Sequence, residues 1–235
     1  MIPKNIFQTW CTKELPPEIQ NIIDKMKEQN PEYKYHLYTD EEMDAFVKEN
    51  YPGEIYECYS QLNFIVAKAD FWRYLILYKY GGVYLDMDSC INNIKLDDFI
   101  KTEDSAILSP ENGRNTFTQW ALFFDLQHPI LKRVIEFVVD NVKTRRYPLD
   151  ILHMTGPFCF TKAVQSVHEE FFGTTIDVLS MKYDTDINYT CPSYSYRIIS
   201  NDYKPYLDFK HPYSHLLYNN KPHWSEVLRE LVKLL

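Results

Sequence analysis

Residues 81–88 read Gly81-Gly82-Val83-Tyr84-Leu85-Asp86-Met87-Asp88, and this stretch decides the fold. The two glycines permit left-handed backbone angles and end a helix, and the short apolar run after them predicts a strand. Because side chains alternate along a strand, Asp86 and Asp88 are expected to point the same way. Such carboxylates repel each other unless they are exposed, protonated or bridged by a divalent cation. Mg²⁺ and Mn²⁺ prefer oxygen ligands, so the stretch points to a cation, a diphosphate and a nucleotide-activated substrate.

A long helix is expected before this stretch, from about Gln61 to Tyr80. Its apolar stripe comprises Leu62, Ile65, Val66, Ala69, Trp72, Leu75 and Ile76. Asp70 and Arg73 are three residues apart and share one face of this helix. Alone they would be interpreted as a surface ion pair of little energetic worth. Beside Asp86 and Asp88 they form a candidate sugar-diphosphate site, in which Arg73 neutralises developing charge and Asp70 holds sugar hydroxyls.

The rest of the chain predicts an α/β sheet with nucleotide bound beyond its strand ends. The expected elements are a strand at Asn5–Trp10, a helix from Pro17 to Asn30, a strand at Tyr33–Tyr38, a helix capped by Thr39 that runs to about Asn50, helices opening at His128-Pro129 and at Thr155-Gly156-Pro157, and a strand at Thr175–Leu179. His128 is expected to cap its helix. The segment from Lys182 to Pro222 is rich in Tyr, Asp, Asn, Ser and Pro and is expected to form loops.

Composition excludes several classes of protein. With 45% hydrophobic residues and 16% aromatic residues, the chain can bury one sizeable core, and a net charge of -8 argues against wholesale binding to nucleic acid or anionic membrane. No apolar run is long enough to span a bilayer, and the start Met1-Ile2-Pro3-Lys4 lacks a secretory pattern. The five cysteines lack CxxC spacing, which favours reduced thiols over a zinc cluster. We expect a soluble, cytoplasmic protein of microbial or viral type rather than a trimmed catalytic domain.

Four blocks of sequence resemble glycosyltransferase family 32. The ordered string from Ala69 to Asp88 resembles the family's DXD region and is also similar in spacing to the glucosyltransferase domains of large clostridial toxins. Ile2–Trp10 resembles the opening strand IPKIIHQTW, with Phe7 in place of the family's histidine. Gln119-Trp120 and Gln127–Leu131 resemble blocks of the fungal α-1,6-mannosyltransferases, with Gln127 in place of a glycine. Met154–Pro157, with Thr161, resembles the TGP…T block.

This resemblance implies a GT-A fold, a Rossmann-like mixed sheet flanked by helices with a loop-rich C-terminal section. It implies one domain over residues 1–235, in which about 1–108 bind the nucleotide sugar and about 109–235 form the acceptor side. The implied activity is that of a retaining hexosyltransferase that uses Mn²⁺ or Mg²⁺, a nucleotide-sugar donor and a carbohydrate-bearing acceptor. We nominate no general base, because retention implies attack on the same face, with the departing phosphate oxygen taking the proton.

Site residues follow from the resemblance position by position. Asp70, Arg73, Asp86 and Asp88 form the catalytic set. The donor would be bound by Gln8, Thr9, Trp10, Asp70, Arg73, Tyr84 and Asp86, with Trp10 stacking on the base or, equally well, closing the core. The metal would be held by Asp86, Asp88 and a C-terminal histidine, for which His215 is the first choice and His211 and His223 are the alternatives.

Several alternatives stay open. The Gln119-Trp120 and His128-Pro129 blocks favour GDP-mannose, but family members with a similar DXD region use UDP-galactose, UDP-N-acetylglucosamine or UDP-glucose. A non-catalytic nucleotide-sugar-binding module is a second possibility, opposed by the intact acidic and basic residues. A metal-dependent phosphohydrolase would need further metal ligands near the first strand, and Ile6–Thr9 supplies none.

Overall fold

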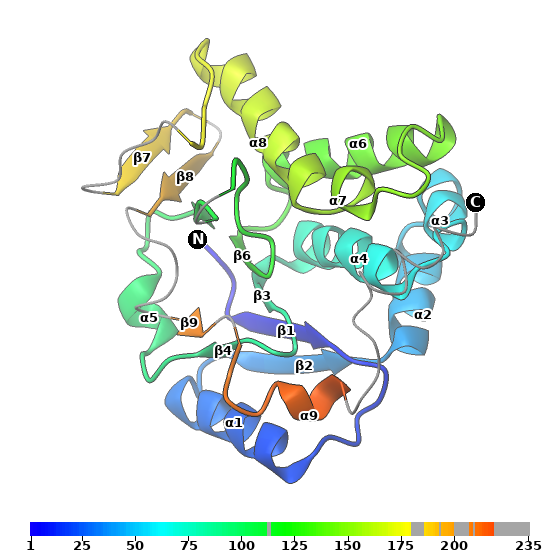
Figure 1. Cartoon of the computed structure of the whole chain (residues 1–235). Coiled ribbons are helices and arrows are strands. Elements are labelled where there is room, and N and C mark those ends of the chain that lie inside the picture. Colours follow the sequence, from blue (N-terminus) through cyan, green and yellow to red (C-terminus); the bar gives the residue numbers. More distant parts are fainter. Residues whose placement is uncertain (112–113, 180–185, 193, 200–206, 209, 219–235) are drawn as a thin grey trace.

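The computed structural model describes residues 1–111, 114–179, 186–192, 194–199, 207–208 and 210–218 (Figure 1). Within them a mixed sheet of seven strands runs in the order β2 (Lys34–Tyr38), β1 (Asn5–Thr9), β3 (Gly82–Leu85), β6 (Ala121–Phe124), β5 (Ala106–Leu108), β8 (Ser195–Ile198) and β7 (Ile187–Thr190). A small second sheet pairs β4 (Cys90–Ile91) with β9 (Leu207–Asp208).

The three strands β2, β1 and β3 are parallel, whereas β6 runs antiparallel to both β3 and β5. Strand β8 is parallel to β5 and antiparallel to β7. Because β1 and β3 are parallel neighbours, their carboxyl ends lie at the same edge of the sheet. This arrangement brings Trp10, after β1, and Asp86, after β3, to one region.

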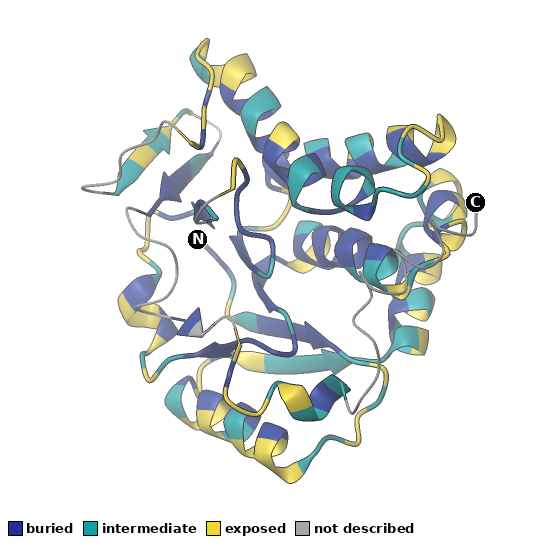
Figure 2. Ribbon diagram, in the orientation of Figure 1, coloured by how far each residue is buried: buried dark blue, intermediate teal, exposed yellow. Residues whose placement is uncertain are grey.

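Helices cover both faces of the sheet. They are α1 (Pro17–Gln29), α2 (Asp40–Asn50), α3 (Glu54–Ser60), α4 (Ile65–Tyr80), α5 (Leu96–Phe99), α6 (Pro129–Lys143), α7 (Ile151–Met154), α8 (Pro157–Phe172) and α9 (His215–Tyr218). In β3, Tyr84 packs into the core under α4, α6 and α8, whereas Val83 and Leu85 pack into the opposite core near α1 and α5. Figure 2 shows the central strands buried between these layers. The predicted α/β class is confirmed, and the sheet draws strands from both predicted halves of the domain.

The glycines before the DXD segment act as the sequence predicts. Helix α4 ends at Tyr80 and is capped by Gly81, which has a φ of 61°, and Gly82 has a φ of 114°. A Cβ on Gly81 would lie 2.6 Å from Pro3 Cδ, and one on Gly82 would lie 2.7 Å from the Asn5 carbonyl oxygen. Both positions therefore need glycine for backbone angle and for space, since real Cβ atoms do not approach so closely.

Two predicted helix starts are confirmed by side-chain contacts. Thr39 and Glu42 form a reciprocal capping box at the start of α2. The His128 ring accepts a hydrogen bond of 3.3 Å from the Ile130 backbone NH at the start of α6. Gln127, which replaces the family's glycine, has a φ of 54°, so the left-handed turn is kept without the glycine. Phe7, which replaces the family's histidine, is buried and stacks on His36 with ring centroids 4.9 Å apart.

Three local predictions were wrong. The helix expected from Gln61 begins at Ile65, because Phe64 has an extended backbone, and the separate helix α3 precedes it. The strand expected at Thr175–Leu179 is absent from its described residues. Ile176 and Val178 are buried there, but the Ile176 carbonyl oxygen accepts from the Gln165 side chain at 2.8 Å instead of from a neighbouring strand.

The segment expected as loops from Lys182 to Pro222 also contains β7, β8, β9 and α9. Its tyrosines are the reason, because Tyr189 and Tyr196 face each other across the β7–β8 pair with centroids 5.0 Å apart. Aromatic cross-strand pairs stabilise sheets, and a loop prediction based on polarity does not count them.

Candidate active site

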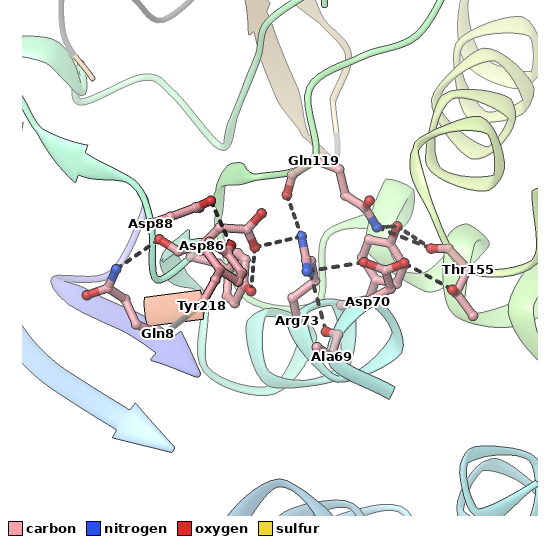
Figure 3. A network of polar contacts seen from close by, with 11 residues as sticks. Gln8, Ala69, Asp70, Arg73, Asp86, Asp88, Gln119, Thr155 and Tyr218 are labelled. Carbon is pink, nitrogen blue, oxygen red and sulfur yellow. Dashed lines mark hydrogen bonds and ion pairs between the residues drawn. The ribbon is translucent and has the colours of Figure 1, made fainter. Parts of the chain in front are cut away.

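The DXD segment is a turn and not the end of a strand. Strand β3 ends at Leu85, and the Asp86 NH donates to the Trp120 carbonyl oxygen at 2.8 Å. The Ser89 NH then donates to the Asp86 carbonyl oxygen at 2.9 Å, which closes a turn over residues 86–89. Strand alternation therefore does not place Asp86 and Asp88. The turn nevertheless keeps the two carboxylates close enough to interact electrostatically (Figure 3).

Gln8 fixes this turn from strand β1. Its amide nitrogen donates to the Asp86 carbonyl oxygen at 3.0 Å, and its amide oxygen accepts from the Tyr35 hydroxyl at 3.0 Å. The side chain is buried, so these bonds are shielded from water. Gln8, predicted to bind the donor, is thus placed against the backbone of residues 86–89, which we call the acidic turn.

Arg73 lies at the centre of the network. Its guanidinium lies 3.1 Å from Asp70 Oδ1 and 3.2 Å from Asp86 Oδ1, and it donates to the Gln119 carbonyl oxygen at 3.0 Å. It also lies 4.4 Å from the centre of the Tyr84 ring. Arg73 is 5% exposed, so the interpretation as a surface ion pair is wrong. A planar guanidinium can serve several acceptors at once, and here it joins α4 to the end of β3.

Tyr84 supports the same carboxylate from the strand. Its hydroxyl donates to Asp86 Oδ1 at 2.8 Å, and the Thr9 side chain hydrogen-bonds to Tyr84. One oxygen of Asp86 is therefore occupied by Tyr84 and Arg73. The other, Oδ2, has no hydrogen-bond partner among the described residues, and the Asp86 side chain is 31% exposed. This oxygen is available to a ligand.

On the far side of Arg73, Asp70 is held by a network that includes Thr155, Tyr74 and Gln119. Thr155 Oγ1 donates to Asp70 Oδ2 at 3.1 Å. The Tyr74 hydroxyl donates to the Thr155 carbonyl oxygen at 2.8 Å. The Gln119 side-chain amide donates to the Tyr74 hydroxyl oxygen and to the same Thr155 carbonyl oxygen. Burial raises the pKa of Asp70 to about 6, although Arg73 and Thr155 act to lower it.

Burial also raises the pKa of Asp86 and of Asp88. Arg73 lowers the pKa of Asp86 while the neighbouring Asp88 raises it, so the two carboxylates disfavour each other's charge. A hard divalent cation would relieve that repulsion. The donor set fits such a cation, since both ligands are carboxylates and Asp86 Oδ2 is free of described partners. Over the described ranges, no group of three or more His, Cys, Asp and Glu side chains is gathered to hold a metal, so this pair would share a cation with phosphate oxygens or water.

The histidines proposed as a third ligand are placed differently. His215 is exposed, and its Nδ1 lies 3.2 Å from the Pro212 carbonyl oxygen. His211 is buried against the acidic turn, where its NH donates to the Asp88 carbonyl oxygen at 2.9 Å. His223 lies outside the described residues. The choice of His215 stays a prediction.

Trp10 lies at the end of β1, beside the turn. It is partly exposed and meets Tyr218 edge to face, with ring centroids 6.0 Å apart. It also packs on a small apolar cluster with Met87 and Leu217. Both predicted roles of Trp10 are compatible with this position.

Four residues of the network were not predicted as site residues, namely Tyr74, Gln119, Thr155 and Tyr218. The first three stand in blocks that resemble the family, so the signal was present, but contact with Asp70 or Arg73 depends on the packing of α4 against the β6 region and α7. Tyr218 stands in the stretch that follows His215, but its contact with Asp88 crosses 130 residues of sequence and no local rule predicts it.

The comparisons with known proteins agree with this geometry. Residues 16–106 match the family model described as "Glycosyltransferase sugar-binding region containing DXD motif". The chain is 33% identical over 161 residues to the inositol phosphoceramide mannosyltransferase 3 of Schizosaccharomyces pombe, covering 66% of this chain and 43% of that protein. It is 28% identical over 202 residues to the initiation-specific alpha-1,6-mannosyltransferase of Candida albicans, covering 69% of this chain and 52% of that protein.

The chain thus spans about half the length of the curated relatives it matches. Among solved structures, the PaToxG glycosyltransferase superposes with a TM-score of 0.59 at 19% identity, covering 71% of this chain and 70% of that one. No helix in the described part of the chain is long and apolar enough to cross a membrane.

Residues 16–106 thus match a DXD-containing sugar-binding region of glycosyltransferases, and the fold is similar to that of the PaToxG glycosyltransferase. The resemblance to the DXD glycosyltransferases of family 32 and their fungal mannosyltransferase branch is confirmed.

Proposed function

We propose that this protein is a metal-dependent, retaining glycosyltransferase that moves a hexose from a nucleotide sugar to a glycan, glycolipid or protein acceptor. The observation that carries the proposal is the position of Arg73 between Asp70 and Asp86. The buried Arg73 guanidinium pairs with two carboxylates near the carboxyl ends of the parallel strands. Nucleotides bind at this edge of the sheet in open α/β folds. Such an arrangement is costly to bury unless it serves a site.

Asp86 and Asp88 would hold Mn²⁺ or Mg²⁺ together with the diphosphate of the donor. When bound, the cation would supply Lewis-acid neutralisation of the leaving diphosphate. Arg73 adds a fixed positive charge beside the same turn, in a site from which water is largely excluded. Charge in such a place stabilises a departing anion without reorganisation.

Asp70 would hold hydroxyls of the donor sugar. Its carboxylate is kept in place by Thr155 and Arg73, both of which are buried, and it is therefore presented in one orientation. Trp10 and Thr9 would lie beside the nucleotide base of the donor, at the end of β1. Attack by the acceptor hydroxyl on the same face would transfer its proton to the departing phosphate oxygen, so no residue is assigned as a base.

GDP-mannose is the favoured donor. The two fungal relatives are named mannosyltransferases, which supports the preference drawn from the Gln119-Trp120 and His128-Pro129 blocks. A UDP-hexose is the alternative. A non-catalytic binding module is disfavoured because the acidic and basic groups are complete and hydrogen-bonded.

The test is a panel of GDP-mannose and UDP-hexoses with Mn²⁺, in which nucleotide release is measured with and without a chelator. Asp88→Asn should abolish metal-dependent release while the urea unfolding midpoint stays unchanged. Asp140→Asn, on the surface of α6, is the matched control and should release nucleotide at the wild-type rate. Full turnover by Asp88→Asn, or turnover in the presence of chelator, would overturn the metal-dependent mechanism.

Two further results would identify the donor and the third metal ligand. Release from UDP-sugars alone would remove the preference for GDP-mannose. Unchanged Mn²⁺ dependence in His215→Ala would reassign the third ligand to His211, His223 or water.

A further inference from the structure

The segment from Lys210 to Tyr218, near the C-terminus of the described chain, forms two hydrogen bonds to Asp88 in the acidic turn. At one end, the His211 NH donates to the Asp88 carbonyl oxygen at 2.9 Å. At the other end, the Tyr218 hydroxyl donates to Asp88 Oδ2 at 3.0 Å. Figure 3 shows Tyr218 reaching the carboxylate from the end of α9. Both the backbone and the side chain of Asp88 are thus held by one short segment.

Helix α9 is itself anchored beside the turn. Leu217 is buried in an apolar cluster with Ile19 and Ile23 of α1 and with Met87, the residue between the two acidic ones. The Tyr218 ring lies edge to face with Trp10 at an interplanar angle of 84°. Packing on two sides therefore fixes the direction in which the Tyr218 hydroxyl points.

We propose that Tyr218 is a positioning residue for Asp88, whose hydroxyl orients the carboxylate for a divalent cation. The inference rests on the proposed function, in which Asp88 is a metal ligand. Carboxylates that bind metals are commonly oriented by hydrogen bonds from outer residues, and loss of such a partner costs roughly 10–100-fold in metal affinity.

A tyrosine suits this task better than a cationic residue. A lysine or arginine at the same place would neutralise Asp88 and compete with the cation, whereas a neutral hydroxyl leaves the carboxylate charge intact. A tyrosine hydroxyl carries its proton at neutral pH, so it remains a donor to Asp88 Oδ2. Asp88 is 7% exposed, so water competes little for the same oxygen.

The experiment measures Mn²⁺ binding to the full chain by isothermal titration calorimetry, in the absence of any donor sugar and again with GDP. Tyr218→Phe removes one oxygen and keeps the ring against Trp10. We expect its dissociation constant for Mn²⁺ to rise about tenfold, with an unchanged urea unfolding midpoint. Tyr213→Phe is the matched control, because Tyr213 lies on the same segment and is exposed, and its affinity should equal that of the wild type.

Leu217→Ala is the second variant, which loosens α9 but keeps the hydroxyl, and it should also weaken Mn²⁺ binding. Equal or tighter binding by a folded Tyr218→Phe protein would overturn the positioning role and leave the proposed function standing. Absence of Mn²⁺ binding by the wild type, with and without GDP, would instead refute the cation site and both proposals with it.

Discussion

Arg73 Nη1 lies 3.2 Å from Asp86 Oδ1, although one residue is in the middle of helix α4 and the other follows strand β3. This ion pair fixes the acidic turn to the helix that precedes it. Because Arg73 also pairs with Asp70, one buried guanidinium sets the spacing between the Asp70 and Asp86 carboxylates. Asp70, Arg73 and Asp86 are thus one connected unit and not three independent side chains.

The first prediction is that Arg73→Lys breaks this unit. An ammonium is a point charge and cannot serve Asp70, Asp86 and the Gln119 carbonyl oxygen in one plane. We expect the free energy of unfolding in urea to fall by about 1–3 kcal/mol, the usual cost of leaving buried acceptors unsatisfied. Nucleotide release should fall at least tenfold, that is by about 1.4 kcal/mol or more in activation free energy.

The control for this prediction is Arg146→Lys. Arg146 pairs with Asp140 at 2.8 Å, but both side chains are about half exposed. An exposed pair of this kind contributes little, so stability should change by less than about 1 kcal/mol. Equal losses of unfolding free energy in the two variants would show that the buried guanidinium of Arg73 contributes no more than an exposed one.

How much of this site is predictable from sequence depends on the range of each contact. Asp70 and Arg73 are three residues apart on a helix, and Gly81 and Gly82 act through their own backbone angles, so local rules identify them. The pairing of Asp86 with Arg73 was expected only as membership of one site, because its distance depends on how α4 packs on β3.

Other contacts and strands could not be predicted from the sequence, because they depend on contacts between separate elements of the fold. The Thr155 contact with Asp70 spans 85 residues and the Tyr218 contact with Asp88 spans 130. No periodicity or capping rule reports on such distances. Strands β7 and β8 were missed because their stability comes from cross-strand aromatic contacts, and the composition alone is typical of loops.

A second prediction compares two glycines of positive φ. Gly173 lies in the left-handed helical region, with a φ of 65° and a ψ of 15°, and a Cβ on it would meet nothing within 4 Å. Gly81 has a φ of 61° and a ψ of -178°, a region that is essentially restricted to glycine, and a Cβ on it would clash with Pro3 and Leu126. Gly173→Ala should therefore cost only the left-handed strain, about 1–2 kcal/mol. Gly81→Ala should cost clearly more, because its backbone angles are more strained for alanine and overpacking adds about 1–3 kcal/mol. Urea unfolding of the two variants makes the comparison, and equal losses would contradict the close approach.

A third prediction concerns pH. The pKa of Asp70 is raised from 3.8 to about 6, so the folded chain binds this proton more tightly than the unfolded chain. The resulting stabilisation is fully present below about pH 3.8 and is lost as the pH rises through about 6. The free energy of unfolding of the wild type relative to Asp70→Asn should thus rise by roughly 1–3 kcal/mol between pH 7 and pH 4.

Activity should move in the opposite direction. Ionised Asp70 pairs with Arg73, so nucleotide release should show an acidic limb with a midpoint near the Asp70 pKa of about 6. A pH–rate profile of the wild type at saturating donor tests this. A flat profile between pH 5 and 7 would mean that Asp70 acts equally well when protonated.

The last prediction assigns part of that pKa to Thr155. Its single hydroxyl hydrogen has two acceptors, Asp70 Oδ2 at 3.1 Å and the Ile151 carbonyl oxygen at 3.4 Å, and the shorter contact is to the carboxylate. This bond favours the charged form, so Thr155→Val should raise the pKa of Asp70 by about one unit, since hydrogen bonds to charged groups contribute about 1.5–3 kcal/mol. Thr155→Ser keeps the hydroxyl and is the matched control. Carboxyl-carbon NMR of aspartate-labelled protein, assigned with Asp70→Asn, measures the shift directly. If the Asp70 pKa is the same in Thr155→Val as in the wild type, the hydroxyl donates to Ile151 in solution, and Arg73 alone sustains the charge on Asp70.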